Sequence, residues 1–287
     1  MTQFMPLLQL IYQLILILPL LWLSQRLWIF ITPYDDHKII RETKLSPSGI
    51  LLAGYLLAVA VIMILVFHGE TFDYLSDTVT IFSMAILANL CLLLAFYLSS
   101  KAFAKKYTAQ DYKVFYEIES GNFAVAVYLL FLLVSTAVQL VVANYGKEID
   151  FYTWILVVLP YFLIGQLIIL TSTFLFQKAS FYEGLKNGNL AIAISYGALL
   201  LSISLVVGKV LYQVEIFDAE SVFLVLLYSF LYVTFLSYVP EKFSTVILKK
   251  ELTNEIIAGN IDFALVQGVV KVIFAIVIIH SMNFSLV

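Results

Sequence analysis

The amino-acid sequence predicts an all-α, polytopic membrane protein, with eight transmembrane helices built as four parallel two-helix hairpin repeats. Its composition points to a membrane: 62% of the 287 residues are hydrophobic and 12% are charged, whereas soluble chains carry about 25% charged residues. A short motif that begins with Gly-Asn also recurs along the chain, each time at the start of an apolar run. Composition therefore predicts the membrane class, and the motif predicts the repeat.

Eight apolar runs are long enough to cross the hydrocarbon of a bilayer, which takes about 20 residues of helix. We expect helices because a helix satisfies its own backbone hydrogen bonds in lipid, and because the runs do not alternate in polarity. The first run lacks a preceding Lys or Arg and a following cleavage motif, so we expect a retained span rather than a signal peptide. The runs cover residues 6–31, 48–67, 79–100, 122–144, 152–177, 189–212, 221–239 and 260–281.

Basic residues distinguish the two sides of the membrane. Lys and Arg gather in every second loop, and the loops between these hold almost none. Because basic loops are retained in the cytoplasm, we expect both chain termini to lie outside it. The four basic loops cover residues 33–47, 101–121, 178–188 and 240–259.

The repeated motif stands at the cytoplasmic start of the second helix of each hairpin. It reads Gly-Asn-x-x-x-Ala, and its three copies begin at Gly121, Gly188 and Gly259. A degraded copy begins at Ser46. All four hairpins then enter the membrane with the same orientation, so an axis along the membrane normal relates them. We expect a pseudo-fourfold bundle or a pair of paired hairpins.

One face of the motif helices carries small residues below the asparagine. Ala193 and Gly197 follow Asn189 at intervals of four, and the helix after Asn260 repeats the pattern. Small faces let helices approach closely in lipid, where interhelical hydrogen bonds add to the packing. One interpretation is that this face serves packing alone. The other is that the amides of Asn122, Asn189 and Asn260 ring a polar mouth.

The linker at residues 241–257 alternates apolar and charged residues near helical spacing. It is either an amphipathic helix that lies in the membrane interface or an extension of the preceding span. In both cases its lysines would lie near anionic lipid headgroups.

Lys271 is the most informative single residue. It lies about 17 Å along a helix from Asn260 at 1.5 Å per residue, and a lysine at the centre of a span costs roughly 2.5–3.5 kcal/mol on insertion scales. Lys271 and Gln267, one turn earlier, either line a polar pathway or are accommodated in a helix seam. Asp262 replaces the alanine of the other copies, and it either pairs with a linker lysine or meets a cation.

Several functional classes find no support in the residues. Cys91 is the only cysteine, and the three histidines lie far apart, so we expect no disulfide framework, metal site or other cofactor. No nucleophile motif, phosphate-binding loop or dinucleotide motif is present, and we expect no catalytic residue and no enzymatic activity. The formal net charge of -3 gives no electrostatic basis for nucleic-acid binding.

The stretch Thr32-Pro33-Tyr34-Asp35-Asp36, followed by Ser46 to Gly54 and by the Asn-x-Ala-x-Ala starts, resembles the domain of unknown function 350. This is a family of bacterial inner-membrane proteins, and two of its four-helix units would cover residues 1–146 and 147–287. Ser46 departs from the pattern, because it stands where the family has asparagine. The resemblance implies an association with envelope stress and membrane remodelling, and it supplies no catalytic residue.

Two functions follow. The first is a non-enzymatic component of envelope integrity in the bacterial inner membrane, which docks a peripheral cytoplasmic protein through its basic linkers. The alternative is a channel or transporter for an ion or small polar solute, which the polar residues of the last hairpin favour. The bilayer is the one partner that composition requires, and a homo-oligomer is left open.

Overall fold

The computed structural model describes residues 5–32, 46–66, 74–106, 114–144, 154–176, 179–213, 219–248 and 252–282. These described residues are helical and contain no strand. The first helices of the four hairpins are α1 (Met5–Ile31), α4 (Tyr74–Lys106), α8 (Leu159–Phe176) and α11 (Ala219–Leu248). A π-helical turn, η1 (Trp154–Val158), leads into α8. The second helices are α3 (Pro47–Val66), α6 (Phe123–Asn144), α10 (Leu190–Tyr212) and α13 (Ile261–Ser281).

Three short helices lie on the linkers that precede the Gly-Asn motifs: α5 (Val114–Glu119), α9 (Ala179–Lys186) and α12 (Leu252–Ile257). The linker at 241–257 combines two elements. Helix α11 continues without interruption to Leu248, so its last residues extend the span, and α12 is a separate turn.

The predicted apolar runs are helical over most of their length in the structure. Six described helices are long and apolar enough to cross a membrane, and shorter apolar helices at Pro47–Met63 and Leu156–Ser172 lie at the two remaining positions. The chain is therefore a multi-pass membrane protein by length and composition, and the count of eight crossings stays a prediction.

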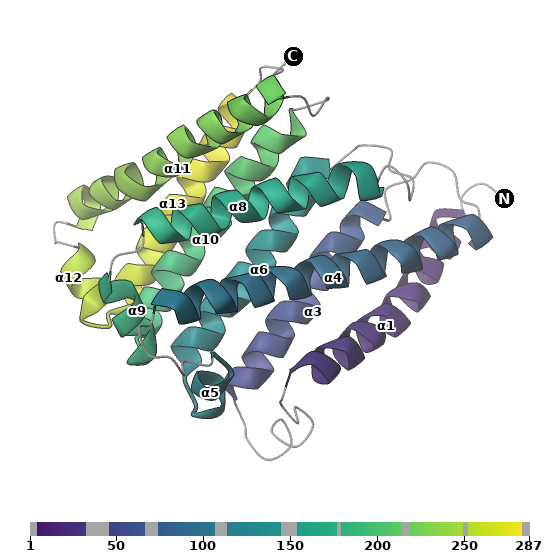
Figure 1. Cartoon of the computed structure of the whole chain (residues 1–287), viewed down its shortest axis with the longest axis horizontal. Coiled ribbons are helices and arrows are strands. Elements are labelled where there is room, and N and C mark those ends of the chain that lie inside the picture. Colours follow the sequence, from purple (N-terminus) through teal and green to yellow (C-terminus); the bar gives the residue numbers. More distant parts are fainter. Residues whose placement is uncertain are drawn as a thin grey trace.

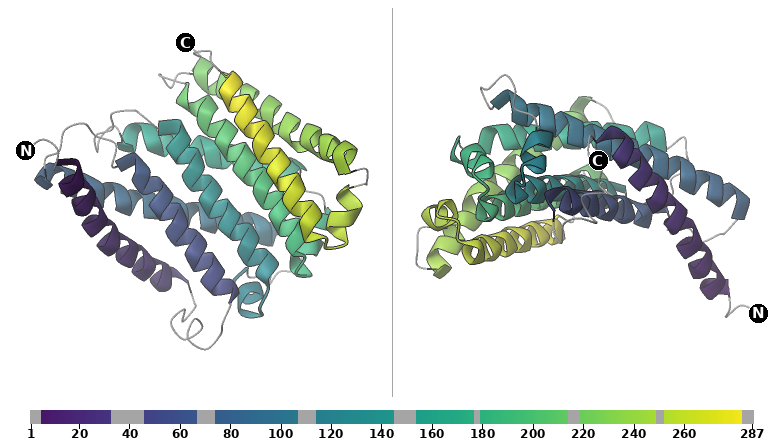
Figure 2. Two further views of the ribbon diagram at one scale, coloured as in Figure 1. Left: turned by 180° about the vertical axis from the view of Figure 1, so that it is seen from behind. Right: turned by 90° about the horizontal axis from the view of Figure 1, so that it is seen from below.

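The helices form two layers (Figure 1). The second helices α3, α6, α10 and α13 lie side by side in chain order and run in the same direction (Figure 2). The first helices α4, α8 and α11 form the other layer and also follow chain order. Helix α1 slants across the edge of both layers, next to α3 (Figure 2). All four hairpins thus share one orientation, but the layers are open at both ends. The expected pseudo-fourfold bundle is not formed.

Each inner helix of the row contacts its two neighbours with different faces. On α6, Leu130 packs on Gly54 of α3, whereas Phe131 packs on Gly197 of α10. On α10, Gly197 packs against Phe131 of α6, whereas Ala198 packs against Gly268 of α13. The contact therefore propagates in a line from one repeat to the next.

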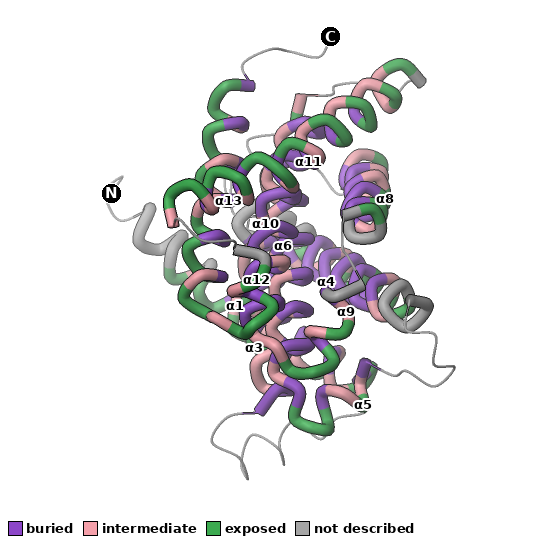
Figure 3. The backbone as a smooth tube through the Cα atoms, turned by 90° about the vertical axis from the view of Figure 1, so that its left-hand side faces the viewer, coloured by how far each residue is buried: buried purple, intermediate pink, exposed green. Residues whose placement is uncertain are grey.

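Burial follows from this arrangement. Buried residues concentrate on α6 and α10 in the middle of the row, and exposed residues concentrate on α11 and α13 at its edge (Figure 3). At the other edge, the fully buried Trp28 of α1 holds α3 and α4, since its ring lies 4.7 Å from that of Tyr55 and 5.3 Å from that of Phe96. Large side chains thus fill the first hairpin, whereas glycines allow close approach in the middle.

Gly208 provides a test of the close approach between α6 and α10. A Cβ atom at Gly208 would lie 2.9 Å from the backbone oxygen of Gln139 and 2.9 Å from Cβ of Val142. We expect Gly208→Ala to destabilise the protein by about 1 kcal/mol, because the strain of overpacking exceeds the better helix propensity of alanine. Thermal denaturation in detergent measures this, and Ala53→Val, which adds volume at an exposed position of α3, is the control. An unchanged midpoint for Gly208→Ala would show that the helices separate at no cost.

Candidate functional site

Each Gly-Asn pair ends one helix and starts the next. Gly188 has a φ of 75°, in the left-handed region that favours glycine. Its N–H donates to the oxygen of Leu185 at 3.0 Å, and the N–H of Asn189 donates to the oxygen of Gly184 at 2.9 Å, which is the Schellman pattern of a helix end. The side chain of Asn189 then accepts from the N–H of Ile192 at 3.2 Å and caps α10. Gly121 and Gly259 repeat this junction.

The asparagine amides also bind the following repeat. Nδ2 of Asn122 donates to the carbonyl oxygens of Leu185 and Lys186, at 2.9 and 3.2 Å, at the end of α9. One repeat later, Nδ2 of Asn189 donates to two carbonyl oxygens at the end of α12, those of Ile256 at 3.1 Å and Ile257 at 3.0 Å. Carbonyls at a helix end lack a partner within the helix, so these amides satisfy them.

The amide of Asn260 makes a different contact. Nδ2 of Asn260 donates instead to Oε2 of Glu255, within its own linker, at 3.1 Å. The three asparagines thus lie one per repeat along the row, and the structure does not bring them together around one mouth.

Amides inside the membrane layer connect neighbouring helices. The hydroxyl of Tyr55 on α3 donates to Oδ1 of Asn89 on α4. Between α6 and α8, Nε2 of Gln139 donates to the oxygen of Tyr161 at 3.0 Å. Nε2 of Gln166 donates to Oγ1 of Thr136 at 3.1 Å. These three amides therefore bind helices to one another.

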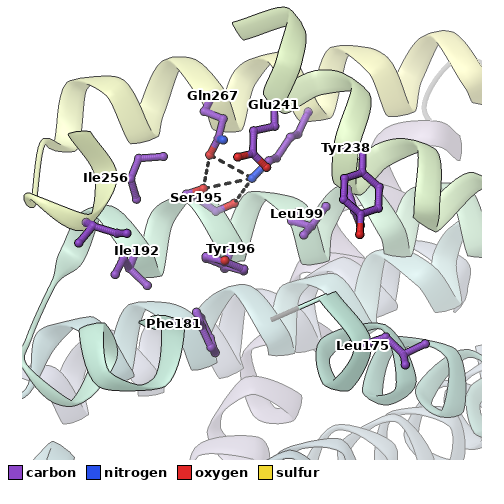
Figure 4. Close-up of a pocket in the computed structure, with 13 residues that line it drawn as sticks. Leu175, Phe181, Ile192, Ser195, Tyr196, Leu199, Tyr238, Glu241, Ile256 and Gln267 are labelled. Carbon is purple, nitrogen blue, oxygen red and sulfur yellow. Dashed lines mark hydrogen bonds between the residues drawn. The ribbon is translucent and has the colours of Figure 1, made fainter. Parts of the chain in front are cut away.

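Lys271 lies in the seam between α13 and α10 and is 5% exposed. Its Nζ lies 3.1 Å from each of three oxygens: the backbone oxygen of Ser195, Oγ of Ser195 and Oε1 of Gln267. The hydroxyl of Ser195 donates to Oε1 of Gln267 as well (Figure 4). An ammonium group has three N–H donors, so these oxygens can use all of them.

The repeat shows that this position does not need a lysine for packing. Lys271 is the eleventh residue after Asn260, and the eleventh residues after Asn122 and Asn189 are Leu133 and Leu200. Both leucines are buried. The last repeat therefore replaces a core leucine with a charged side chain at the same place.

A cavity of about 160 Å³ lies beside Lys271, between α10, α11 and α13. This is room for several water molecules. Ile256 and Ile257 of α12 line it from the linker, and the amide of Asn189 holds their carbonyls. Seven polar residues line the cavity: Ser195, Tyr196, Ser237, Tyr238, Glu241, Gln267 and Lys271.

Glu241 brings a negative charge to this cavity. It follows Pro240 inside α11, and its side chain lines the same cavity as Lys271 (Figure 4). Proline has no N–H, so the carbonyl of Leu236, four residues earlier, lacks its usual helical partner at this level of α11. An ammonium and a carboxylate from two different helices thus face one cavity.

The structure brings Gln267 and Lys271 together, as the sequence suggested, and separates Asp262 from them. Asp262 is exposed in the first turn of α13, and the linker lysines considered as its partners, Lys249 and Lys250, lie outside the described residues. Sequence reasoning missed Ser195, Tyr196 and Glu241. A span that ended at residue 239 assigned Glu241 to a linker, and its position next to Pro240 was the available signal.

Comparison with known proteins gives one match. The family model described as Domain of Unknown Function (DUF350) matches residues 2–143 and again residues 150–282. The resemblance seen in the motifs is thereby confirmed in tandem form. No curated protein and no solved structure matches the chain.

Proposed function

We propose that this chain, which belongs to the DUF350 family and carries its domain twice, moves an ion or small polar solute across a membrane through the cavity beside Lys271. The observation that carries the proposal is the buried ammonium of Lys271, with a carboxylate across a cavity, inside a bundle of apolar helices. Charged residues inside membrane bundles usually face polar pathways.

The repeat strengthens this proposal. A lysine at the centre of a span costs roughly 2.5–3.5 kcal/mol on insertion scales, whereas leucine occupies the same position in α6 and α10. The fold can therefore place an apolar side chain at this position. Among these three repeats, the last one alone has a charged residue there. Such a departure is expected where a charge serves a function.

Docking of a cytoplasmic partner at the bacterial envelope stays a prediction. It rests on the basic linkers, and segments 33–45, 107–113 and 249–251 of these linkers lie outside the described residues. The location in an inner membrane and the sidedness of the termini are likewise predictions from composition.

Reconstitution into liposomes tests the transport function. We expect the purified protein to release a trapped mixture of inorganic ions and small polar solutes faster than empty liposomes do. Lys271→Leu, which restores the residue of the other repeats, should lower the rate by at least about tenfold, because each 1.4 kcal/mol of lost stabilisation is a factor of ten. Lys209→Leu is the matched control, since Lys209 lies in the last turn of α10 with its Nζ 4.6 Å from the ring centre of Tyr212. If no solute moves faster than in empty liposomes, the proposal is wrong.

A further inference from the structure

The three oxygens around Nζ of Lys271 form a site for a cation. They come from the backbone and hydroxyl of Ser195 and from the amide of Gln267, each at 3.1 Å. The ring of Tyr196 adds its face, with its centre 5.7 Å from Nζ. Oxygen acceptors and an aromatic face favour positive charge, so the protein has placed its own tethered cation in this site.

The same contacts argue against an anionic solute. All three N–H donors of the Lys271 ammonium have oxygen partners, so an anion would have to displace Ser195 or Gln267. It would also meet the carboxylate of Glu241, which lines the same cavity. A cation meets neither obstacle, provided that the charge of Lys271 is removed when it enters.

The described cavity lining supplies few other groups that titrate. Tyr196 of α10 and Tyr238 of α11 contribute phenol groups, which are neutral hydrogen-bonding groups and not ions. Helix α12 contributes only Ile256 and Ile257 to the lining. When Lys271 loses its proton, Glu241 is therefore the one charged group among the described lining residues.

We propose, on the basis of the transport function above, that the solute is a monovalent inorganic cation that exchanges one-for-one with the proton of Lys271. In one state the ammonium of Lys271 balances the carboxylate of Glu241. In the other, the N–H bond of the ammonium has broken, the proton has left to water, and a cation such as Na⁺ or K⁺ beside Glu241 balances the same carboxylate. The cavity is electrically neutral in both states, and a divalent ion would leave one positive charge unbalanced.

A pH-sensitive dye inside the liposomes tests this exchange. An outward gradient of Na⁺ or K⁺ should acidify the lumen of liposomes that contain the wild-type protein, because each cation that leaves admits one proton. We expect Glu241→Gln and Lys271→Arg each to lower the initial rate of acidification by at least about tenfold. Arginine keeps the positive charge but does not release its proton in proteins, so it separates proton exchange from a purely structural role of the charge. Lys209→Arg is the control and should leave the rate unchanged.

The outcomes distinguish this inference from the function on which it rests. Flux of any solute without a cation-driven pH change overturns cation–proton exchange and leaves transport intact. An unchanged rate for Lys271→Arg, in protein that elutes as the wild type does on size exclusion, also overturns the exchange. A pH change driven by Mg²⁺ as strongly as by Na⁺ or K⁺ overturns the monovalent selectivity. The absence of any flux overturns both proposals.

Discussion

Replacing Gln267 with leucine is expected to lower the free energy of unfolding by about 2–4 kcal/mol, because it leaves a buried charge short of a partner. Oε1 of Gln267 accepts a hydrogen bond from Nζ of Lys271 and another from the hydroxyl of Ser195. Leucine fills similar space but accepts neither bond. Thermal denaturation of the detergent-solubilised protein, followed by the loss of its monodisperse elution peak, measures the effect.

A double variant separates this loss of a partner from a general effect on packing. Lys271→Leu removes the charge and restores the residue type of Leu133 and Leu200, and replacing buried polar pairs with apolar residues is often neutral or stabilising. We therefore expect Gln267→Leu with Lys271→Leu to recover most of the lost stability. If the two substitutions simply add, within about 0.5 kcal/mol, then Gln267 does not stabilise Lys271 and the polar cluster is incidental.

Asn189→Ser is expected to lower the free energy of unfolding by about 1–3 kcal/mol, because two carbonyls at the end of α12 lose their donor. Serine keeps the helix cap, as Ser46 does in the first repeat, where its hydroxyl accepts from the N–H of Gly49 at 3.1 Å. Serine has no amide to reach the carbonyls of Ile256 and Ile257. Besides lower stability, we expect faster hydrogen exchange in α12, measured by mass spectrometry.

Asn260→Ser is the matched control for this contact between repeats. Asn260 caps α13 as Asn189 caps α10, but among the described residues its amide donates to Glu255 of its own linker and to no other repeat. The control should therefore cost less than about 0.5 kcal/mol, the value usual for changes away from buried partners. Equal losses for the two variants would mean that the cap, and not the contact with the next repeat, determines stability.

Much of the local structure follows from residue patterns that act over a few turns of chain. The length of each apolar run predicts a spanning helix, because about 20 apolar residues in a helix are stable in the hydrocarbon of a bilayer. Helix α11 extends beyond the expected end of the span at residue 239 and reaches Leu248, as one of the two interpretations of the linker predicted. The end of a helix in a bundle depends on its contacts with neighbouring helices. The sequence pattern does not show which contacts these are.

The candidate site could be predicted only in part. Lys271 and Gln267 share a helix face at a spacing of four residues, so their proximity could be predicted from helical periodicity. Ser195 and Glu241 approach them from two other helices. Their meeting depends on the register between α10, α11 and α13, which no local pattern specifies.

By itself, the sequence determined the helices, their turn at each Gly-Asn pair and the repetition of the hairpin, because hydrophobicity, glycine conformation and helix capping are local properties. The tertiary structure alone decided that the hairpins form an open row and that a lysine, a glutamate and a serine face one cavity. The physical reason is that both outcomes depend on which helix faces meet. Close approach at Gly197 and Gly208 sets the contact of α10 with α6 in the row, through residues far apart in the chain.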